Sequence, residues 1–231
     1  MQSSTPDLDR PMLRMGSVAF IAGIIIIIVS TLFHATSEDL TNHPIVFAIY
    51  AESDPWIAAH IGEFAGVMLV FGGGFLALHR LLIRSESLTA SALAWMGLAV
   101  TILVASTFSI LQGVDGIALK RAVDSWYAVA PAATEEKAIA FRVAEGIRWI
   151  EIGINSMFRI LQGTVGIIFG VAIAKSAILS RWIGGIGVFV GATTIIVGLS
   201  VAYAGFSPSL AVLGLVLPIT WAAWLGILGI F

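Results

Sequence analysis

Long apolar runs separated by short polar stretches dominate the pattern of the chain. Six runs lie at roughly 15–34, 57–82, 88–113, 150–175, 182–204 and 209–230. A bilayer core about 30 Å thick needs about 20 apolar residues in a helix, so each run is long enough to cross it. The pattern predicts an all-α fold: a polytopic membrane helix bundle with six transmembrane helices, forming a single membrane domain over residues 1–231.

The third and fourth helices are predicted to be longer than the membrane is thick. Helical character runs from about 88 to 127 and from about 134 to 175, with a break at 128-AVAPAAT-134. Forty helical residues extend about 60 Å. We therefore expect an extramembrane hairpin over roughly 114–149. A solvated hairpin is the simpler interpretation, and a docking surface for a homo-oligomer or a membrane-complex partner is the alternative.

Composition supports a membrane location. The chain is 58% hydrophobic and 11% charged, whereas soluble domains average about 25% charged residues. We therefore expect the lipid bilayer to surround it. The net charge of −2 gives no indication of a nucleic-acid partner. The absence of cysteine excludes disulfides and thiolate metal sites.

The distribution of basic residues predicts the orientation. Those that flank the spans on one side are Arg10, Arg14, Arg80, Arg84, Lys175 and Arg181. The loop 35–55 on the other side has no Lys or Arg and contains four acids. The positive-inside rule therefore predicts that both termini are cytoplasmic.

Polar residues recur on one face of the fourth helix. They are Arg148, Glu151, Asn155, Arg159 and Gln162, at spacings of three or four. Counting helical turns places four further polar residues at similar heights in the outer half of the bundle: His34, His60, Glu63 and Gln112. The sequence thus predicts a polar layer there.

Charges inside a membrane are expensive and are usually paired. Arg159 lies 16 residues before Lys175, and Glu63 lies 19 residues before Leu82. At 1.5 Å per residue these positions are about 24 and about 28 Å from the same membrane face. We therefore predict that Glu63 is the counter-ion of Arg159. The same count places Asp115 near Arg148, which predicts a second pair at the outer surface.

Three functions for the polar layer remain open. It can be a structural network that fixes helix register, because buried polar groups must be satisfied. It can line a pocket for an ion or for a small or lipid-like ligand, since such pockets combine apolar walls with a few polar groups. It can also belong to an intramembrane enzyme that depends on a metal or a haem.

The enzyme hypothesis requires a specific ligand set. His34, His60, Glu63 and Glu151 supply the imidazole and carboxylate donors that zinc and iron bind. His43 and Asp39 can extend this set. His34 and His60 can alternatively hold a haem between two helices. No Ser/His/Asp arrangement stands out.

Four segments carry a resemblance to a known type of protein. They are 55-PWIAAHIGEFAGV-67, 111-LQGVDGIALKRAVDSW-126, 145-EGIRWIEIG-153 and 180-SRWIGGIGVFVG-191. They resemble small six-helix prokaryotic integral membrane proteins of an uncharacterised family. The resemblance implies a six-helix fold and a multi-pass location in a prokaryotic plasma membrane. It implies no reaction.

Overall fold

The structure is a computed structural model that describes residues 9–34, 40–207 and 211–230, with the backbone alone for residue 9 and residues 211–215. These residues form helices and no strand. The elements are α1 (Asp9–Leu32), α2 (His43–Ala51), α3 (Trp56–Val67), η1 (Met68–Gly74), α4 (Phe75–Leu82), α5 (Leu88–Gln112), η2 (Gly113–Leu119), α6 (Lys120–Ala128), α7 (Thr134–Ser176), α8 (Arg181–Ala204) and α9 (Ala211–Ile230).

Five helical stretches are long and apolar enough to cross a membrane. They are Arg10–Leu32, Trp56–Leu82, Leu88–Ala128, Thr134–Ser176 and Arg181–Ala204. The prediction of an all-helical membrane protein is confirmed at this level. The sixth predicted run, 209–230, begins outside the described residues and continues in α9, which contains Pro218. The part of α9 whose side chains are described, Val216–Ile230, is shorter than the five stretches.

The helix boundaries differ from the predicted ones at two places. The helix α1 begins at Asp9, before the predicted span 15–34. Pro11 lies in its first turn, where proline is tolerated because the backbone N–H there has no partner within the helix. The helix α2 lies in a segment that the sequence analysis treats as a loop. Its nine residues, 43-HPIVFAIYA-51, are too few to cross a membrane, so a search for spans does not find it.

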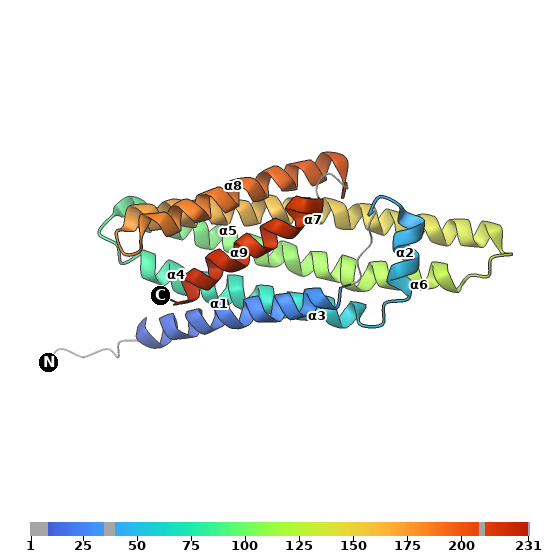
Figure 1. Ribbon diagram of the computed structural model, residues 1–231, viewed down its shortest axis with the longest axis horizontal. Helices are drawn as coiled ribbons and strands as arrows, with labels where there is room; N and C mark the ends of the chain where they lie inside the picture. Colours follow the sequence, from blue (N-terminus) through green and yellow to red (C-terminus); the bar gives the residue numbers. More distant parts are fainter. Residues whose placement is uncertain (1–8, 35–39, 208–210, 231) are drawn as a thin grey trace.

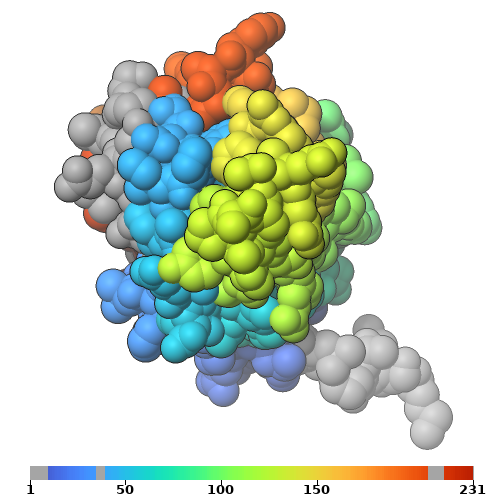
Figure 2. Space-filling view, turned by 90° about the vertical axis from the view of Figure 1, so that its right-hand side faces the viewer, coloured from blue at the N-terminus to red at the C-terminus, as the bar shows by residue number. Residues whose placement is uncertain are grey.

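The longest helices form an antiparallel hairpin. The stretch Leu88–Ala128 has 41 residues and α7 has 43, and residues 129–133 connect them. Figure 1 shows that α1 and α8 end well short of the tip of this hairpin, while α2 lies across its side. Figure 2 looks onto this end of the molecule, where α2 and the hairpin lie side by side. We call it the hairpin end.

A separate small core stabilises the hairpin end. Its buried residues come from α2, α3, η2, α6 and α7: Val46, Phe47, Tyr50, Trp56, Leu119, Val123 and Ala144. The larger core fills the rest of the bundle around Phe71, Phe75, Phe169 and Trp224. The helix α2 therefore covers an apolar surface that the hairpin alone would leave exposed.

Glycines bring α7 and α8 into close contact. A β-carbon on Gly191 would lie 2.7 Å from the backbone nitrogen of Ile167 and 2.5 Å from the carbonyl oxygen of Gly163. Gly170 and Gly184 meet in the same way further along the two helices. Small residues commonly allow such an approach between membrane helices.

Two segments, η1 and η2, are π-helical. A π-helical turn contains an extra residue relative to an α-helix and often occurs at functional sites. The segment η2 follows directly on α5 and contains Asp115 and Gly116. It is therefore the element that orients Asp115.

Candidate functional site

His60 is the most deeply buried member of the predicted polar layer on α3, with 2% of its surface exposed. Its Nδ1 lies 2.7 Å from the carbonyl oxygen of Trp56. A carbonyl only accepts hydrogen bonds, so Nδ1 carries the proton. In the neutral ring Nε2 therefore presents a lone pair. This is the tautomer that a metal ligand requires.

Asp115 faces His60 from η2. Its Oδ2 lies 3.2 Å from His60 Nε2. The indole Nε1 of Trp56 donates a hydrogen bond of 3.2 Å to the backbone carbonyl of Asp115. Gly116 makes room for this approach, because a β-carbon there would lie 2.5 Å from the β-carbon of His60. Trp56 thus holds both members of the pair.

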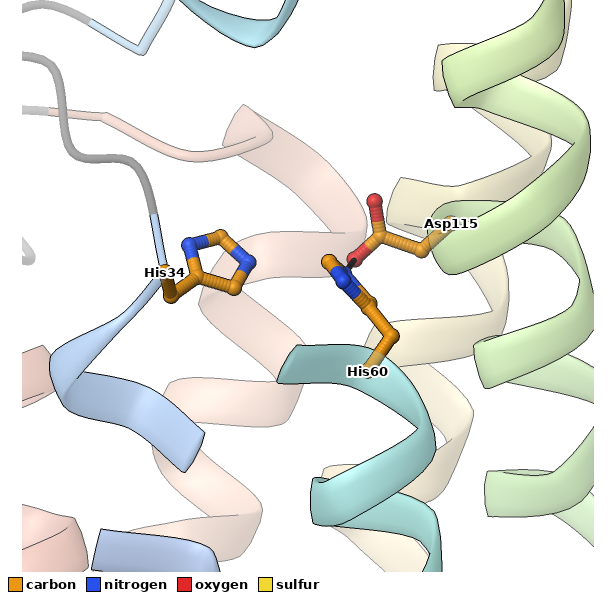
Figure 3. A group of neighbouring side chains, drawn as sticks. All are labelled: His34, His60 and Asp115. Atoms are coloured by element: carbon orange, nitrogen blue, oxygen red, sulfur yellow. Dashed lines mark ion pairs between the residues drawn. The ribbon is translucent and has the colours of Figure 1, made fainter. Parts of the chain in front are cut away.

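His34 completes a group of three. It lies just beyond α1, and its ring centroid is 4.7 Å from that of Trp56 and 4.9 Å from that of His60. Figure 3 shows His34 and Asp115 on opposite sides of the His60 ring. One ligand atom from each of His34, His60 and Asp115 lies within 4.8 Å of the others.

Three buried acceptors at this place have no hydrogen-bond partner among the described residues. They are His60 Nε2, Asp115 Oδ1 and Gln112 Oε1. Although His60 Nε2 and Asp115 Oδ2 are close, they do not form a directed hydrogen bond. Buried polar atoms without partners are rare and mark strained or functional places. A cluster of buried lone pairs favours a cation.

Glu63 lies beside this group but does not pair with Arg159. Its Oε1 accepts a hydrogen bond of 3.1 Å from Thr31, and its Oε2 accepts one of 3.4 Å from Gln112. The predicted pair of Glu63 and Arg159 is therefore wrong. Counting turns fixes the height of a residue but not its direction, and Glu63 faces α1 and α5.

Arg148 and Glu151 form a buried ion pair within α7. The guanidinium Nη1 lies 2.5 Å from Glu151 Oε2, and each residue is 2% exposed. The guanidinium also lies over the ring of Tyr50 at 5.6 Å. The predicted pair of Asp115 and Arg148 is thus wrong, because a carboxylate one helical turn away is closer. Burial raises the pKa of Tyr50 well above its usual range, against the lowering effect of Arg148.

Asn155 and Arg159 lie further along the same face of α7. Arg159 Nε donates a hydrogen bond of 2.7 Å to Asn155 Oδ1. Neither residue belongs to the group around His60. The predicted polar residues are therefore divided into the His34–His60–Asp115 group, the neighbouring pair Glu63–Gln112, the pair Arg148–Glu151 and the pair Asn155–Arg159.

The predicted metal ligands are only partly brought together. His34 and His60 meet as expected, but Asp115 supplies the carboxylate, and Glu63 and Glu151 are not members of the group. Asp115 was predicted from the sequence as the partner of Arg148, not as a metal ligand. Its role depends on η2, and no feature of the sequence identifies a π-helical turn in advance.

The structure does not support the predicted extension of the ligand set by His43 or the alternative of a haem. His43 does not join the group, because its Nδ1 lies 3.3 Å from Glu145 Oε1. Asp39 lies outside the described residues. A haem between His34 and His60 is disfavoured, since axial ligands lie on opposite faces of a porphyrin and these two rings are in direct contact.

A cavity of about 510 Å³ lies at the hairpin end. Its lining residues are Leu40, Thr41, Asn42, His43, Pro44, Glu145, Trp149, Ile152, Ala204, Gly205 and Phe206. Its volume is in the range of pockets for small molecules. None of the nine predicted site residues lines it. Residues from the segment before α2, from α7 and from the end of α8 meet here only in the folded chain, so no sequence spacing predicts it.

Comparisons with protein-family models, with curated proteins and with solved structures found no match to this chain. Membership of a six-helix prokaryotic family therefore stays a prediction. The function must be argued from the geometry of the site.

Proposed function

We propose that the protein is an integral membrane protein that binds a divalent transition-metal ion between His34, His60 and Asp115. The observation that carries this proposal is the convergence of two imidazoles and one carboxylate from three separate segments of the chain: the end of α1, α3 and η2. Imidazole and carboxylate together suit zinc and ferrous iron.

The distances and the second contacts support a metal. Two ligands of a tetrahedral metal at 2.0–2.1 Å lie about 3.3 Å apart, close to the 3.2 Å between His60 Nε2 and Asp115 Oδ2. His60 Nδ1 is bound to a backbone carbonyl, which is the usual outer contact of a metal-binding histidine. The ring of His34 would have to move closer to the other two ligands to bind the same ion, because the three ligand atoms are up to 4.8 Å apart.

Charge balance supports the same proposal. Arg148 and Glu151 compensate each other, which leaves the carboxylate of Asp115 as an additional negative charge among buried residues. A buried charge needs a partner. A divalent cation supplies it and also satisfies the lone pair of His60.

Three protein ligands leave a coordination position open. This arrangement is typical of catalytic metal sites, in which a water or a substrate takes the remaining position, whereas structural zinc sites use four protein ligands. The proposed function is therefore binding of a small ligand at the metal, as in an intramembrane metalloenzyme.

The membrane arrangement is part of the proposal. We propose that α9 is a sixth span, that the hairpin extends beyond the lipid and that both termini are cytoplasmic. The common level at which α1 and α8 end supports a membrane boundary there (Figure 1). The site then lies at the outer boundary, open to ions from that side.

The metal content of the protein in mild detergent tests the proposal. We expect about one zinc or iron ion per chain to stay bound after unbound metal is removed by dialysis. Asp115→Asn should lose this metal. Asp124→Asn is the matched control, because Asp124 pairs with Lys120 outside the site. A protein that retains no metal, or one that retains it equally in both variants, would contradict the proposal.

The cavity supports a second candidate function, binding of a small amphiphile. Trp149, Ile152 and Phe206 provide apolar walls, while His43 and Glu145 provide a polar edge. Decylamine is a suitable probe, since its amine can approach Glu145 while its chain covers the walls. Saturable binding that Ala204→Phe abolishes would support this function, and binding that is unchanged in this variant would exclude the cavity.

A further inference from the structure

Arg159 is a charged residue in the apolar part of α7, within the candidate span Thr134–Ser176. It is half-buried, and its described polar contact is the hydrogen bond from Nε to Asn155 Oδ1. Among the described residues no carboxylate forms an ion pair with its guanidinium. Arg159 therefore differs from Arg148, which has Glu151 as its partner.

An arginine without a counter-ion is costly at membrane depth. A neutral amide such as that of Asn155 orients the guanidinium but does not compensate its charge. Within the part of the chain that the structure describes, the positive charge of Arg159 is thus unpaired in a layer of apolar residues. An anion from outside the chain would remove this cost.

The level of Arg159 indicates where such an anion comes from. A β-carbon on Gly198 of α8 would lie 3.0 Å from the β-carbon of Arg159, so the two residues are at the same height. Gly198 is six residues before Ala204, the last residue of α8, which corresponds to about 9 Å. An arginine side chain can reach the headgroup region over much of that distance by snorkelling.

Trp149 also indicates that the membrane interface lies near the end of α8. A β-carbon on Gly205, just after α8, would lie 3.8 Å from the indole ring of Trp149. The side chain of Trp149 is largely exposed, as is typical of tryptophans at a membrane interface. Arg159 is ten residues after Trp149 on α7, about 15 Å along the helix, and therefore lies on the apolar side of this interface.

A second unsatisfied group lies one turn from Arg159. Ser156 is fully buried, and its Oγ has no hydrogen-bond partner among the described residues. The same β-carbon on Gly198 would also lie 3.0 Å from the carbonyl oxygen of Ser156. Both residues thus belong to one contact region between α7 and α8.

We infer that Arg159 anchors a binding site for the anionic phosphate or carboxylate headgroup of an amphiphile in the bilayer. Asn155 binds Nε, which leaves the two terminal nitrogens to form the paired hydrogen bonds that a guanidinium makes with such groups. The site is separate from the metal ligands and does not depend on a bound metal.

Thermal unfolding in a neutral detergent with a metal chelator tests this site. The probes are short-chain phosphatidic acid, phosphatidylcholine of equal chain length and inorganic phosphate. We expect phosphatidic acid to raise the Tm of the wild type and of the control Arg181→Gln, but not that of Arg159→Gln. Arg181 is an exposed residue at the opposite end of α8.

The Arg159→Gln variant also has an expected change in Tm when no probe is added. Arg159→Gln should unfold at the same or a higher temperature than the wild type, because it removes an uncompensated charge. A large decrease would mean that the protein itself supplies a counter-ion, and it would overturn the inference. An equal response of the wild type and Arg159→Gln to phosphatidic acid would overturn it as well.

Inorganic phosphate distinguishes the source of the anion. A response to phosphatidic acid alone identifies a lipid headgroup, whereas an equal response to inorganic phosphate identifies a free anion at the same site.

Native mass spectrometry of the wild type gives a result that does not depend on folding of a variant. Preferential retention of phosphatidic acid over phosphatidylcholine is expected, and equal retention would contradict the site.

Discussion

His60 Nε2 and Asp115 Oδ2 lie 3.2 Å apart in the bundle, on helical elements separated by 55 positions in the chain. The pair is enclosed by the ring of His34 on one side and the indole of Trp56 on another. A histidine with its lone pair turned toward a carboxylate is an arrangement that a shared cation stabilises. The proposed metal site is built on this relationship.

Trp56 is predicted to position the site. Trp56→Phe keeps the ring that contacts His34 and His60 but removes the hydrogen bond to the carbonyl of Asp115. Loss of an outer contact of this kind typically weakens metal binding about 10- to 100-fold. Metal titration in detergent should show a decrease in this range. Trp95→Phe, at an exposed tryptophan elsewhere, should leave the affinity unchanged.

Gly116 is predicted to be necessary for the close approach of His60. In Gly116→Ala the new β-carbon would lie 2.5 Å from the β-carbon of His60, so α3 or η2 must shift. We expect a loss of about 1–3 kcal/mol in the free energy of unfolding, as for other overpacked cores, and weaker metal binding. Thermal unfolding and metal titration measure these effects.

Gly113→Ala is the matched control, because Gly113 belongs to the same π-helical segment and faces open space. It should be as stable as the wild type or slightly more so, since alanine favours helix over glycine. Equal effects of the two substitutions would show that the conformation of η2, and not the contact with His60, determines the result.

The buried pair of Arg148 and Glu151 is predicted to be sensitive to removal of one partner. Glu151→Gln leaves the guanidinium without its counter-ion, which should lower the free energy of unfolding by roughly 3–5 kcal/mol. The double variant Arg148→Met/Glu151→Leu should recover much of this loss. Chemical unfolding in mixed detergent measures the changes.

An exposed pair on the same helix serves as the control. Arg142 pairs with Glu145 with 77% of its side chain exposed, and such pairs contribute about 0–1 kcal/mol. Arg142→Gln should therefore have little effect. If Glu151→Gln were equally mild, the buried guanidinium would have another partner, and the assignment of the pair would be wrong.

The contact between α7 and α8 is predicted to depend on Gly191. A β-carbon at this position meets backbone atoms of α7, which cannot rotate away. Gly191→Ala should separate the helices and lower the Tm by several degrees or more. Gly185→Ala, on the same helix but facing open space, should not. Equal Tm values for the two variants would contradict the close contact.

The pattern of apolar runs predicted the helical architecture well, because the bilayer dictates the length of a span. The long third and fourth helices were expected from their sequence, and α7 runs from Thr134 to Ser176, close to the predicted 134–175. Glu135 and Glu136 in its first turn favour a helix that starts there. The helix α2 was missed, because short helices are stabilised by tertiary packing more than by their own sequence.

The candidate site was only partly predictable. His34 and His60 were predicted to lie in one polar layer, but Asp115 was predicted to pair with Arg148 at the outer surface. Counting turns gives the height of a residue, whereas pairing also depends on the rotation of each helix. The π-helical segment η2 changes that rotation at Asp115. Glu63 and Arg159 accordingly share a height in the count and bind different partners.

X-ray absorption spectroscopy of the zinc-loaded protein tests the central claim most directly, because it reports the atoms bound to the metal. The account predicts two imidazole ligands and an oxygen at about 2.0–2.2 Å, with one imidazole lost in His60→Gln and the other in His34→Gln. A zinc shell without imidazole, or one that neither substitution changes, would contradict a metal site at His34, His60 and Asp115.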